Sequence, residues 1–150
     1  MKQPVTVLMA DDNPDDRFLT KEAFYEANLT NKLEFVENGE ELLDYLNRSN
    51  KFSNLVGQPL PGLILLDLNM PRKDGREALK EIKSHPHFRR IPVVVLTTSK
   101  ADEDVLRSYD LGVNSFILKP LSFDDFINVI KTFAKYWFEI VHLPNPNTNS

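Results

Sequence analysis

The sequence contains no cysteine and no long hydrophobic run. Without cysteine the chain can form neither disulfide bonds nor thiolate metal sites, which fits a cytoplasmic protein without requiring one. No apolar stretch approaches the roughly 20 residues that cross a bilayer, so we expect no membrane span. The short apolar run after Pro4 ends at Asp11 and Asp12 and is too brief for a signal peptide.

An excess of basic residues is also lacking. The 18 Lys and Arg residues against 22 Asp and Glu residues give a net charge of -4, which argues against a general nucleic-acid binder. The apolar fraction of 41% is ordinary for a globular protein, and 150 residues suit one domain. We expect this domain to cover residues 1–142, followed by a Pro- and Asn-rich tail at 143–150 that is extended or disordered.

Short apolar runs alternate with helical patterns along the chain. The runs predict strands at 5–10, 33–36, 62–67, 91–97 and 115–120. The helical patterns begin at 14, 40, 76, 102 and 122, and the last extends to residue 142. This alternation predicts an α/β fold: a flavodoxin-like, doubly wound, five-stranded parallel sheet in the order 2-1-3-4-5, with five helices.

Local details of the helices and loops can also be predicted. Asn13 is the expected N-cap of the first helix, with Pro14 at its first position. The expected buried stripe of this helix consists of Phe18, Leu19, Ala23, Phe24 and Ala27. Segment 47–61 contains Ser, Asn, Gly and Pro residues, and we expect an exposed loop there.

Polar residues lie at the carboxyl ends of four of the five predicted strands. Asp11 and Asp12 come at the end of the first strand, Asp67 of the third, Thr97 of the fourth and Lys119 of the fifth. Because the carboxyl ends of these strands border one crevice, we expect the five side chains to converge. Three carboxylates that lie close together repel one another and require a cation, and such hard oxygen ligands favour Mg²⁺.

These residue types indicate phosphoryl transfer. A carboxylate held beside Mg²⁺ can attack a phosphoryl group and carry it as an aspartyl phosphate. The Thr97 hydroxyl and the Lys119 ammonium could then neutralise and orient the phosphoryl oxygens. Taken alone, the Asp11-Asp12 pair is more often a helix cap than a metal site. Capping does not explain why all the polar residues follow strands of one sheet.

The sequence resembles the receiver domains of two-component response regulators over residues 5–138. The resemblance lies in LMADDN at 8–13, LLDLNMP at 65–71 with Asp74-Gly75, VLTT at 95–98 and FILKP at 116–120. It implies that Asp67 is the phosphoacceptor. It also implies that Mg²⁺ is bound directly by Asp12, through water by Asp11, and by the main-chain carbonyl of Asn69.

The resemblance further implies how phosphorylation is sensed. Lys119 would pair with the phosphate, Thr97 would swing toward it, and Phe116 would be the aromatic switch that moves inward with Thr97. The peptide bond between Lys119 and Pro120 is usually cis in this family. Asn69 and Ser99 flank the site and would tune the lifetime of the phosphate.

The implied function is that of a signalling protein, not an enzyme. A sensor histidine kinase would transfer a phosphoryl group from its phosphohistidine to Asp67. Because no output domain follows the last predicted helix, we expect the signal to pass through contacts with a downstream protein target. A phosphohydrolase that uses Asp67 transiently is one alternative, although Asn69 stands where such enzymes usually place a second acid. A phosphate-independent adaptor is the other.

The last predicted helix is longer than a minimal receiver domain needs. Its expected core stripe consists of Phe123, Phe126, Ile130, Phe133 and Trp137. A second apolar row consists of Ile127, Ala134, Phe138 and Val141, and Tyr136 and Ile140 widen it. A helix that is apolar over so much of its circumference predicts a homodimer interface at its end. Alternatively, these side chains could cover the loop at 47–61.

The aromatic end of this helix carries a second resemblance. The long last helix with Tyr136-Trp137-Phe138, the terminal Leu-Pro and the widened loop at 47–61 resemble stand-alone regulators that partner cyanobacterial phytochromes. This resemblance implies that the kinase is a light-sensing phytochrome. No chromophore is expected on this chain.

Overall fold

The computed structural model describes residues 5–68, 70–97, 112, 115–118 and 122–140. Its centre is a sheet of five parallel strands in the order β2-β1-β3-β4-β5. The strands are β1 (Val7–Ala10), β2 (Leu33–Val36), β3 (Leu63–Leu66), β4 (Val93–Thr97) and β5 (Ser115–Leu118). The predicted sheet and its strand order are therefore confirmed. β2 matches its predicted range, β1 and β4 begin two residues later than the pattern suggested, and β3 is one residue shorter at each end.

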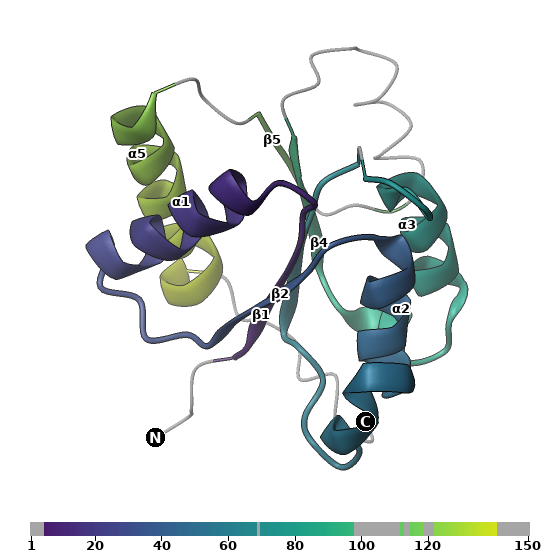
Figure 1. The fold of residues 1–150 in the computed structure, drawn as a ribbon. Helices are drawn as coiled ribbons and strands as arrows, with labels where there is room; N and C mark the ends of the chain where they lie inside the picture. The colour runs from purple at the N-terminus through teal and green to yellow at the C-terminus, as the bar shows by residue number, and fades with distance from the viewer. Residues whose placement is uncertain (1–4, 69, 98–111, 113–114, 119–121, 141–150) are drawn as a thin grey trace.

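Helices cover both faces of the sheet. In the described residues the α-helices are α1 (Pro14–Glu26), α2 (Gly39–Asn47), α3 (Gly75–Ser84) and α5 (Phe123–Ala134). Figure 1 shows α1 and α5 on one face and α2 and α3 on the other. The predicted helix at 102–111 lies outside the described residues. Nowhere in the described part of the chain is a helix long and apolar enough to cross a membrane.

Two apolar clusters anchor these layers. Leu8, Ile64 and Leu66 contribute to the cluster beneath α2 and α3. Their neighbours Met9 and Leu65 point to the opposite cluster, beneath α1 and α5. Successive side chains alternate between the faces of a strand, so an unbroken apolar run is what a strand with two covered faces requires. Each such fully buried side chain contributes about 1.5–3 kcal/mol relative to exposure.

The buried stripe of α1 differs from the prediction. Phe18 is 61% exposed, whereas Thr20, Ala23 and Phe24 are buried. Phe18 precedes Thr20 by two positions, or about 200° around the helix, so both cannot face the sheet. Thr20 can be buried because its hydroxyl donates a hydrogen bond to the main-chain carbonyl of Asp16 at 2.8 Å. The prediction of the buried stripe considered apolar residues alone, and it therefore missed Thr20, whose hydroxyl is hydrogen-bonded within the helix.

The expected exposed loop at 47–61 contains structure of its own. A 3₁₀-helix, η1 (Asn50–Leu55), places Phe52 against Tyr45, with the ring centroids 5.2 Å apart. The Arg48 guanidinium donates to the main-chain carbonyls of Tyr45, Gln58 and Pro59 and so closes the loop. Phe52 packs on the cluster beneath α2 and α3. Because α5 lies on the other face, its described side chains do not cover this loop, and for Phe138 and Val141 the alternative falls outside the described residues.

The last helix changes character along its length. Ser122 caps α5 by accepting a hydrogen bond from the Asp125 N–H, as predicted. The predicted helix continues through the described residues to Ile140, but from Lys135 it is a π-helix, η3 (Lys135–Ile140), rather than an α-helix. Apolar spacing missed the change because both helices satisfy their backbone hydrogen bonds and differ by less than one residue per turn.

Most of the predicted core stripe of this helix is confirmed. Phe126, Ile130, Phe133 and Trp137 are buried, whereas Phe123 is 41% exposed. Of the second apolar row, Ile127 is partly buried against the cluster beneath α1 and α5. Ala134 is 4% exposed and leaves little surface for a second copy. The Phe138 side chain and Val141 lie outside the described residues.

Candidate metal and phosphoacceptor site

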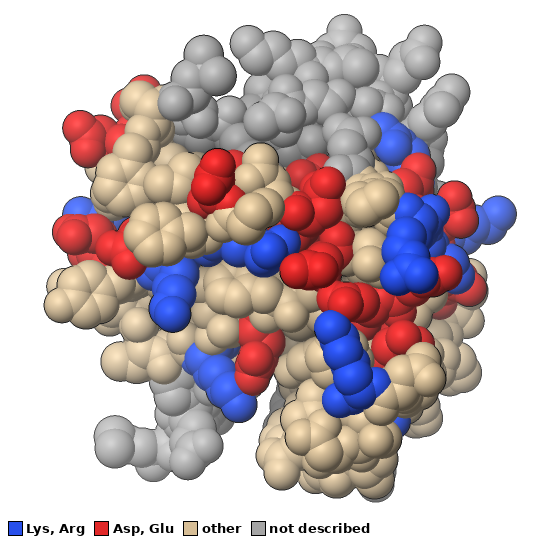
Figure 2. All heavy atoms as spheres, in the orientation of Figure 1, with Lys and Arg blue, Asp and Glu red and all other residues tan. Residues whose placement is uncertain are grey.

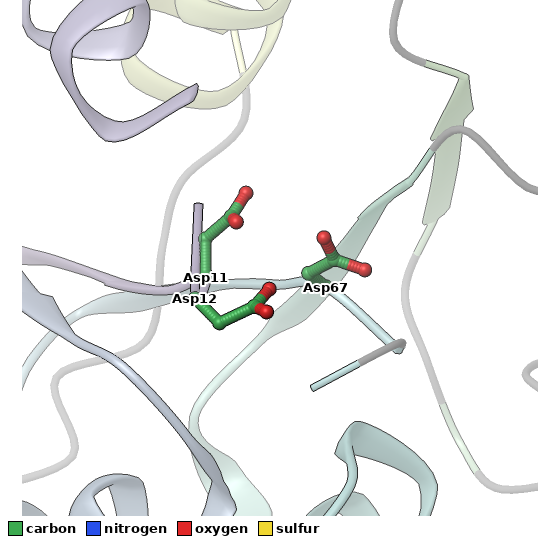
Figure 3. A group of neighbouring side chains, drawn as sticks. All are labelled: Asp11, Asp12 and Asp67. Carbon is green, nitrogen blue, oxygen red and sulfur yellow. The ribbon is translucent and has the colours of Figure 1, made fainter. Parts of the chain in front are cut away.

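Three carboxylates come together where β1 and β3 end. Asp11 and Asp12 follow β1 and Asp67 follows β3, and pairing of Ala10 with Leu66 makes the two strands end level. The Asp67 N–H donates to the Ala10 carbonyl at 2.9 Å and extends the ladder by one bond. One carboxylate oxygen from each residue lies within 4.8 Å of the other two. Figure 3 shows the Asp12 carboxylate directed toward Asp67, with Asp11 beside them.

The three carboxylates differ in their access to solvent. Asp11 is fully buried, Asp67 is partly buried and Asp12 is exposed. The Asp11 N–H donates to the Val36 carbonyl at 3.0 Å, and its Oδ1 accepts from the Asn13 N–H at 2.9 Å. The site is therefore fixed on its inner side and open on its outer side.

The donor set fits a divalent cation. Carboxylates this close repel one another, and in Figure 2 acidic side chains gather at the centre of the face, with basic side chains among them. All three donors are hard oxygen atoms, and two of them are accessible. Mg²⁺ prefers one or two carboxylates and keeps several waters, which such an open site allows.

Helix capping does not account for the two aspartates after β1. The N-cap of α1 is Asn13, as predicted, and its Oδ1 accepts from the N–H groups of Asp15 and Asp16 at 2.8 and 3.4 Å. The Asp11 carboxylate bonds instead to the Asn13 N–H, and Asp12 is exposed in the pocket. The capping explanation for the Asp11-Asp12 pair is therefore wrong.

The loop after β3 packs closely against the helix that follows it. Asp74 caps α3 through the Glu77 N–H at 3.1 Å, and the Gly75 N–H donates to the Leu68 carbonyl at 3.0 Å. A Cβ at Gly75 would overlap the main-chain oxygen of Asp67 and lie 2.7 Å from the Cα of Leu68. The absence of a side chain at Gly75 therefore sets the position of the Asp67 backbone.

Comparison with known proteins agrees with this geometry. The family model of the response regulator receiver domain matches residues 7–131. The chain belongs to this family. Two relatives from different organisms resemble it over nearly their full length. The response regulator Rcp1 of Synechocystis sp. is 38% identical over 94% of this chain and 94% of its own. The probable methanogenesis regulatory protein FilR2 of Methanothrix harundinacea is 38% identical over 97% of this chain and 91% of its own.

Solved structures of receiver domains match the fold. The phosphorylated cyanobacterial phytochrome response regulator RcpA superposes with a TM-score of 0.87, at 37% identity, over 95% of this chain and 99% of its own. The Mn²⁺-bound form of Rcp1 superposes with a TM-score of 0.85, over 94% of this chain and 99% of its own. The chain is thus homologous to phytochrome response regulators.

Several predicted site residues of this receiver domain lie beyond what the structure describes. Asn69, Ser99, Lys119 and the peptide bond from Lys119 to Pro120 are outside the described residues. Thr97 is described in its main chain alone, and it ends β4 at the same edge of the sheet as the carboxylates. Phe116 is likewise described in its main chain, where it pairs with Val95. The predicted convergence is therefore confirmed for Asp11, Asp12 and Asp67, and stays a prediction for the others.

Basic residues near the site of this receiver domain are paired with glutamates. Arg72 Nε lies 3.3 Å from Glu40 Oε2, and Lys73 Nζ donates a hydrogen bond to Glu81 Oε2 at 2.6 Å. The hydrogen bond to Glu81 raises the pKa of Lys73 above its usual value. Arg17, which sequence reasoning overlooked, contacts the main chain of Asp11. Its only sequence signal was its place one helical turn after Asn13, close to the acidic pair.

Proposed function

We propose that this receiver domain accepts a phosphoryl group on Asp67 from the phosphohistidine of a sensor histidine kinase, with Mg²⁺ as cofactor. The supporting observation is the cluster of Asp11, Asp12 and Asp67, whose carboxylate oxygens lie within 4.8 Å of one another. The Mn²⁺-bound structure of Rcp1 and the phosphorylated structure of RcpA add support from homologues.

In the proposed transfer, an Asp67 carboxylate oxygen forms a bond to phosphorus as the bond from phosphorus to the histidine nitrogen breaks. The Asp67 side chain is partly buried and keeps one face open to the donor. Asp11, Asp12, Asp67 and the main-chain carbonyl of Asn69 would hold the cation, which supplies charge neutralisation for the transferring group. We assign the phosphate contacts to Lys119 and Thr97, and the switch role to Phe116.

We propose that the output is a protein contact, in a cytoplasmic setting and without nucleic-acid binding. Phosphorylation adds close to two negative charges at the edge of the sheet, and β4 and β5 end at this same edge. A change there can reach the surface of β5 and α5, where a downstream protein would bind. The likeness to Rcp1 and RcpA favours a phytochrome as the kinase, which mixing with a purified phytochrome kinase and labelled ATP would test.

We also propose that the chain forms a homodimer through its last helix. Tyr136 is 52% exposed, although its ring also packs against Trp137 at a centroid distance of 5.5 Å. A groove of about 770 Å³ beside it is lined in part by Ile117, Val129 and Tyr136. The predicted interface consists of Ile127, Ala134, Phe138 and Val141. Ala134 is already buried within the chain and offers little surface to a partner, so we add the exposed Tyr136 to the proposed interface.

Asp67→Asn tests the proposed phosphoacceptor. Wild-type protein incubated with Mg²⁺ and acetyl phosphate should gain one base-labile phosphate, seen by Phos-tag electrophoresis and intact mass, and Asp67→Asn should gain none. Asp15→Asn is the matched control, because Asp15 is exposed in the first turn of α1, outside the carboxylate cluster, and should be phosphorylated normally.

Two outcomes would contradict the proposal. Continuous release of inorganic phosphate without an adduct would favour a phosphohydrolase that uses Asp67 transiently. No adduct and no release in the wild type would favour a phosphate-independent adaptor.

A further inference from the structure

Arg17 joins three elements at the inner edge of the acidic pocket. Its side chain is 17% exposed, although it lies near the start of α1. Nη1 donates to the main-chain carbonyl of Asp11 at 2.7 Å, and Nη2 donates to Oε1 of Glu37 at 3.4 Å. One guanidinium therefore links α1 to the residue after β1 and to the residue after β2.

The carbonyl that Arg17 contacts controls the direction of Asp12. It belongs to the peptide group between Asp11 and Asp12, and because that group is planar, fixing its oxygen also fixes the nitrogen and Cα of Asp12. The Asp12 carboxylate is exposed, and within the described part of the chain it makes no hydrogen bond of its own. The placement of Asp12 thus depends on its backbone.

Arg17 bonds to the peptide group at the centre of this turn. The Asp11 N–H is bonded to Val36, and the Asn13 N–H is bonded to the Asp11 carboxylate. These bonds hold the turn on either side of the peptide group. The charge-assisted bond from Arg17 holds the carbonyl oxygen of the group between them.

We propose that Arg17 is a positioning residue for Asp12, which keeps the metal pocket in its binding geometry before the cation arrives. This inference rests on the proposed function. It also runs against the simplest electrostatic expectation, because a positive charge beside the pocket should weaken the binding of another cation. If the charge of Arg17 dominates, replacing Arg17 should strengthen cation binding. If its positioning of Asp12 dominates, the same replacement should weaken cation binding.

Arg17→Met removes the charge and both hydrogen bonds and keeps a long side chain. If Arg17 positions Asp12, the dissociation constant for Mn²⁺, measured from the electron paramagnetic resonance signal of the free ion, should rise roughly tenfold. Arg17→Lys keeps the charge and a single donor group and should give an intermediate value. Arg72→Met is the matched control, because Arg72 is exposed and paired with Glu40. It should bind Mn²⁺ as tightly as the wild type or more tightly.

Binding of Mn²⁺ by Arg17→Met as tight as in the wild type, or tighter, would overturn the inference. Thermal unfolding in EDTA separates positioning from a purely structural role, which would lower the midpoint and leave the affinity of the folded protein unchanged. If Arg17→Met does not fold, unchanged affinity in Arg17→Lys would overturn the inference instead. A wild type that binds no Mn²⁺ would contradict the proposed function, whereas equal binding by wild type and variant contradicts this inference alone.

Discussion

At the scale of single residues, Gly75 determines where the candidate phosphoacceptor lies. Its Cα faces the main chain of Asp67 and Leu68, and no side chain fits between them. Gly57 offers a contrast, because its φ of +89° favours glycine while open space surrounds it. One glycine is required by a close contact beside the site and the other by the shape of a distant turn.

Gly75→Ala should therefore damage phosphorylation as well as stability. The added methyl group should cost about 1–3 kcal/mol of unfolding free energy through overpacking. By displacing Asp67 it should slow phosphorylation by acetyl phosphate about ten- to a hundredfold. Gly57→Ala should cost about 1 kcal/mol through backbone strain and leave the rate unchanged. Urea unfolding measures the change in stability, and Phos-tag time courses measure the rate of phosphorylation. Equal phosphorylation rates in Gly75→Ala and Gly57→Ala would contradict the positional role of Gly75.

At the scale of elements, α2 and η1 are held together by an ion pair with a defined pH dependence. The Glu41 carboxylate accepts hydrogen bonds from Lys51 Nζ at 2.6 Å and from the Glu37 N–H at 2.9 Å. Burial alone would raise the pKa of Glu41, but these two bonds outweigh it and hold the pKa below the usual 4.5. The folded state thus binds this proton less readily than the unfolded chain does.

Replacement of Glu41 should therefore lower the free energy of unfolding at neutral pH and have little effect on it in acid. Above pH 4.5 the ionised carboxylate stabilises the fold, and this contribution is lost as the pH falls through the lowered pKa. The difference in unfolding free energy between wild type and Glu41→Gln should be largest at neutral pH and should shrink in acid. Glu40→Gln is the control, since Glu40 is 53% exposed in its pair with Arg72 and should change stability little. A difference that is constant with pH would contradict this account.

At the scale of the whole molecule, the two covered faces of the sheet leave different surfaces free. Phe18 on α1 and Tyr136 in η3 are both large, exposed side chains on the same side of the sheet. Tyr136 borders the groove beside β5, whereas Phe18 lies in the second turn of α1. The proposed dimer uses the first of these surfaces and not the second.

Tyr136→Glu should dissociate the proposed homodimer without unfolding the chain, because a charge would be buried in an apolar interface. Light scattering should give twice the chain mass of 17.3 kDa for the wild type and a single chain mass for this variant. Phe18→Glu introduces the same charge on α1 and should remain dimeric. A wild type that stays monomeric at high concentration would contradict the dimer.

Sequence pattern and tertiary structure contributed differently to the site. Asp11, Asp12 and Asp67 could be predicted because each directly follows an apolar run, and parallel strands bring their carboxyl ends to one edge. The N-caps Asn13 and Ser122 could be predicted because a cap acts on residues two or three positions away. The first inference uses the topology of a parallel sheet, and the second uses hydrogen bonds between residues that are close in sequence.

The amino-acid sequence by itself determined the strands and the described helix starts, since hydrophobic period and turn chemistry are local properties, and it placed the acidic residues at the strand ends. Tertiary structure alone decided that Thr20 is buried and Phe18 exposed, that Phe52 packs under α2, and that Arg17 clamps the Asp11 carbonyl. Each of these depends on which surfaces meet across the fold. A hydroxyl bonded within its own helix, or a guanidinium that reaches a distant carbonyl, leaves no periodic signal in the chain.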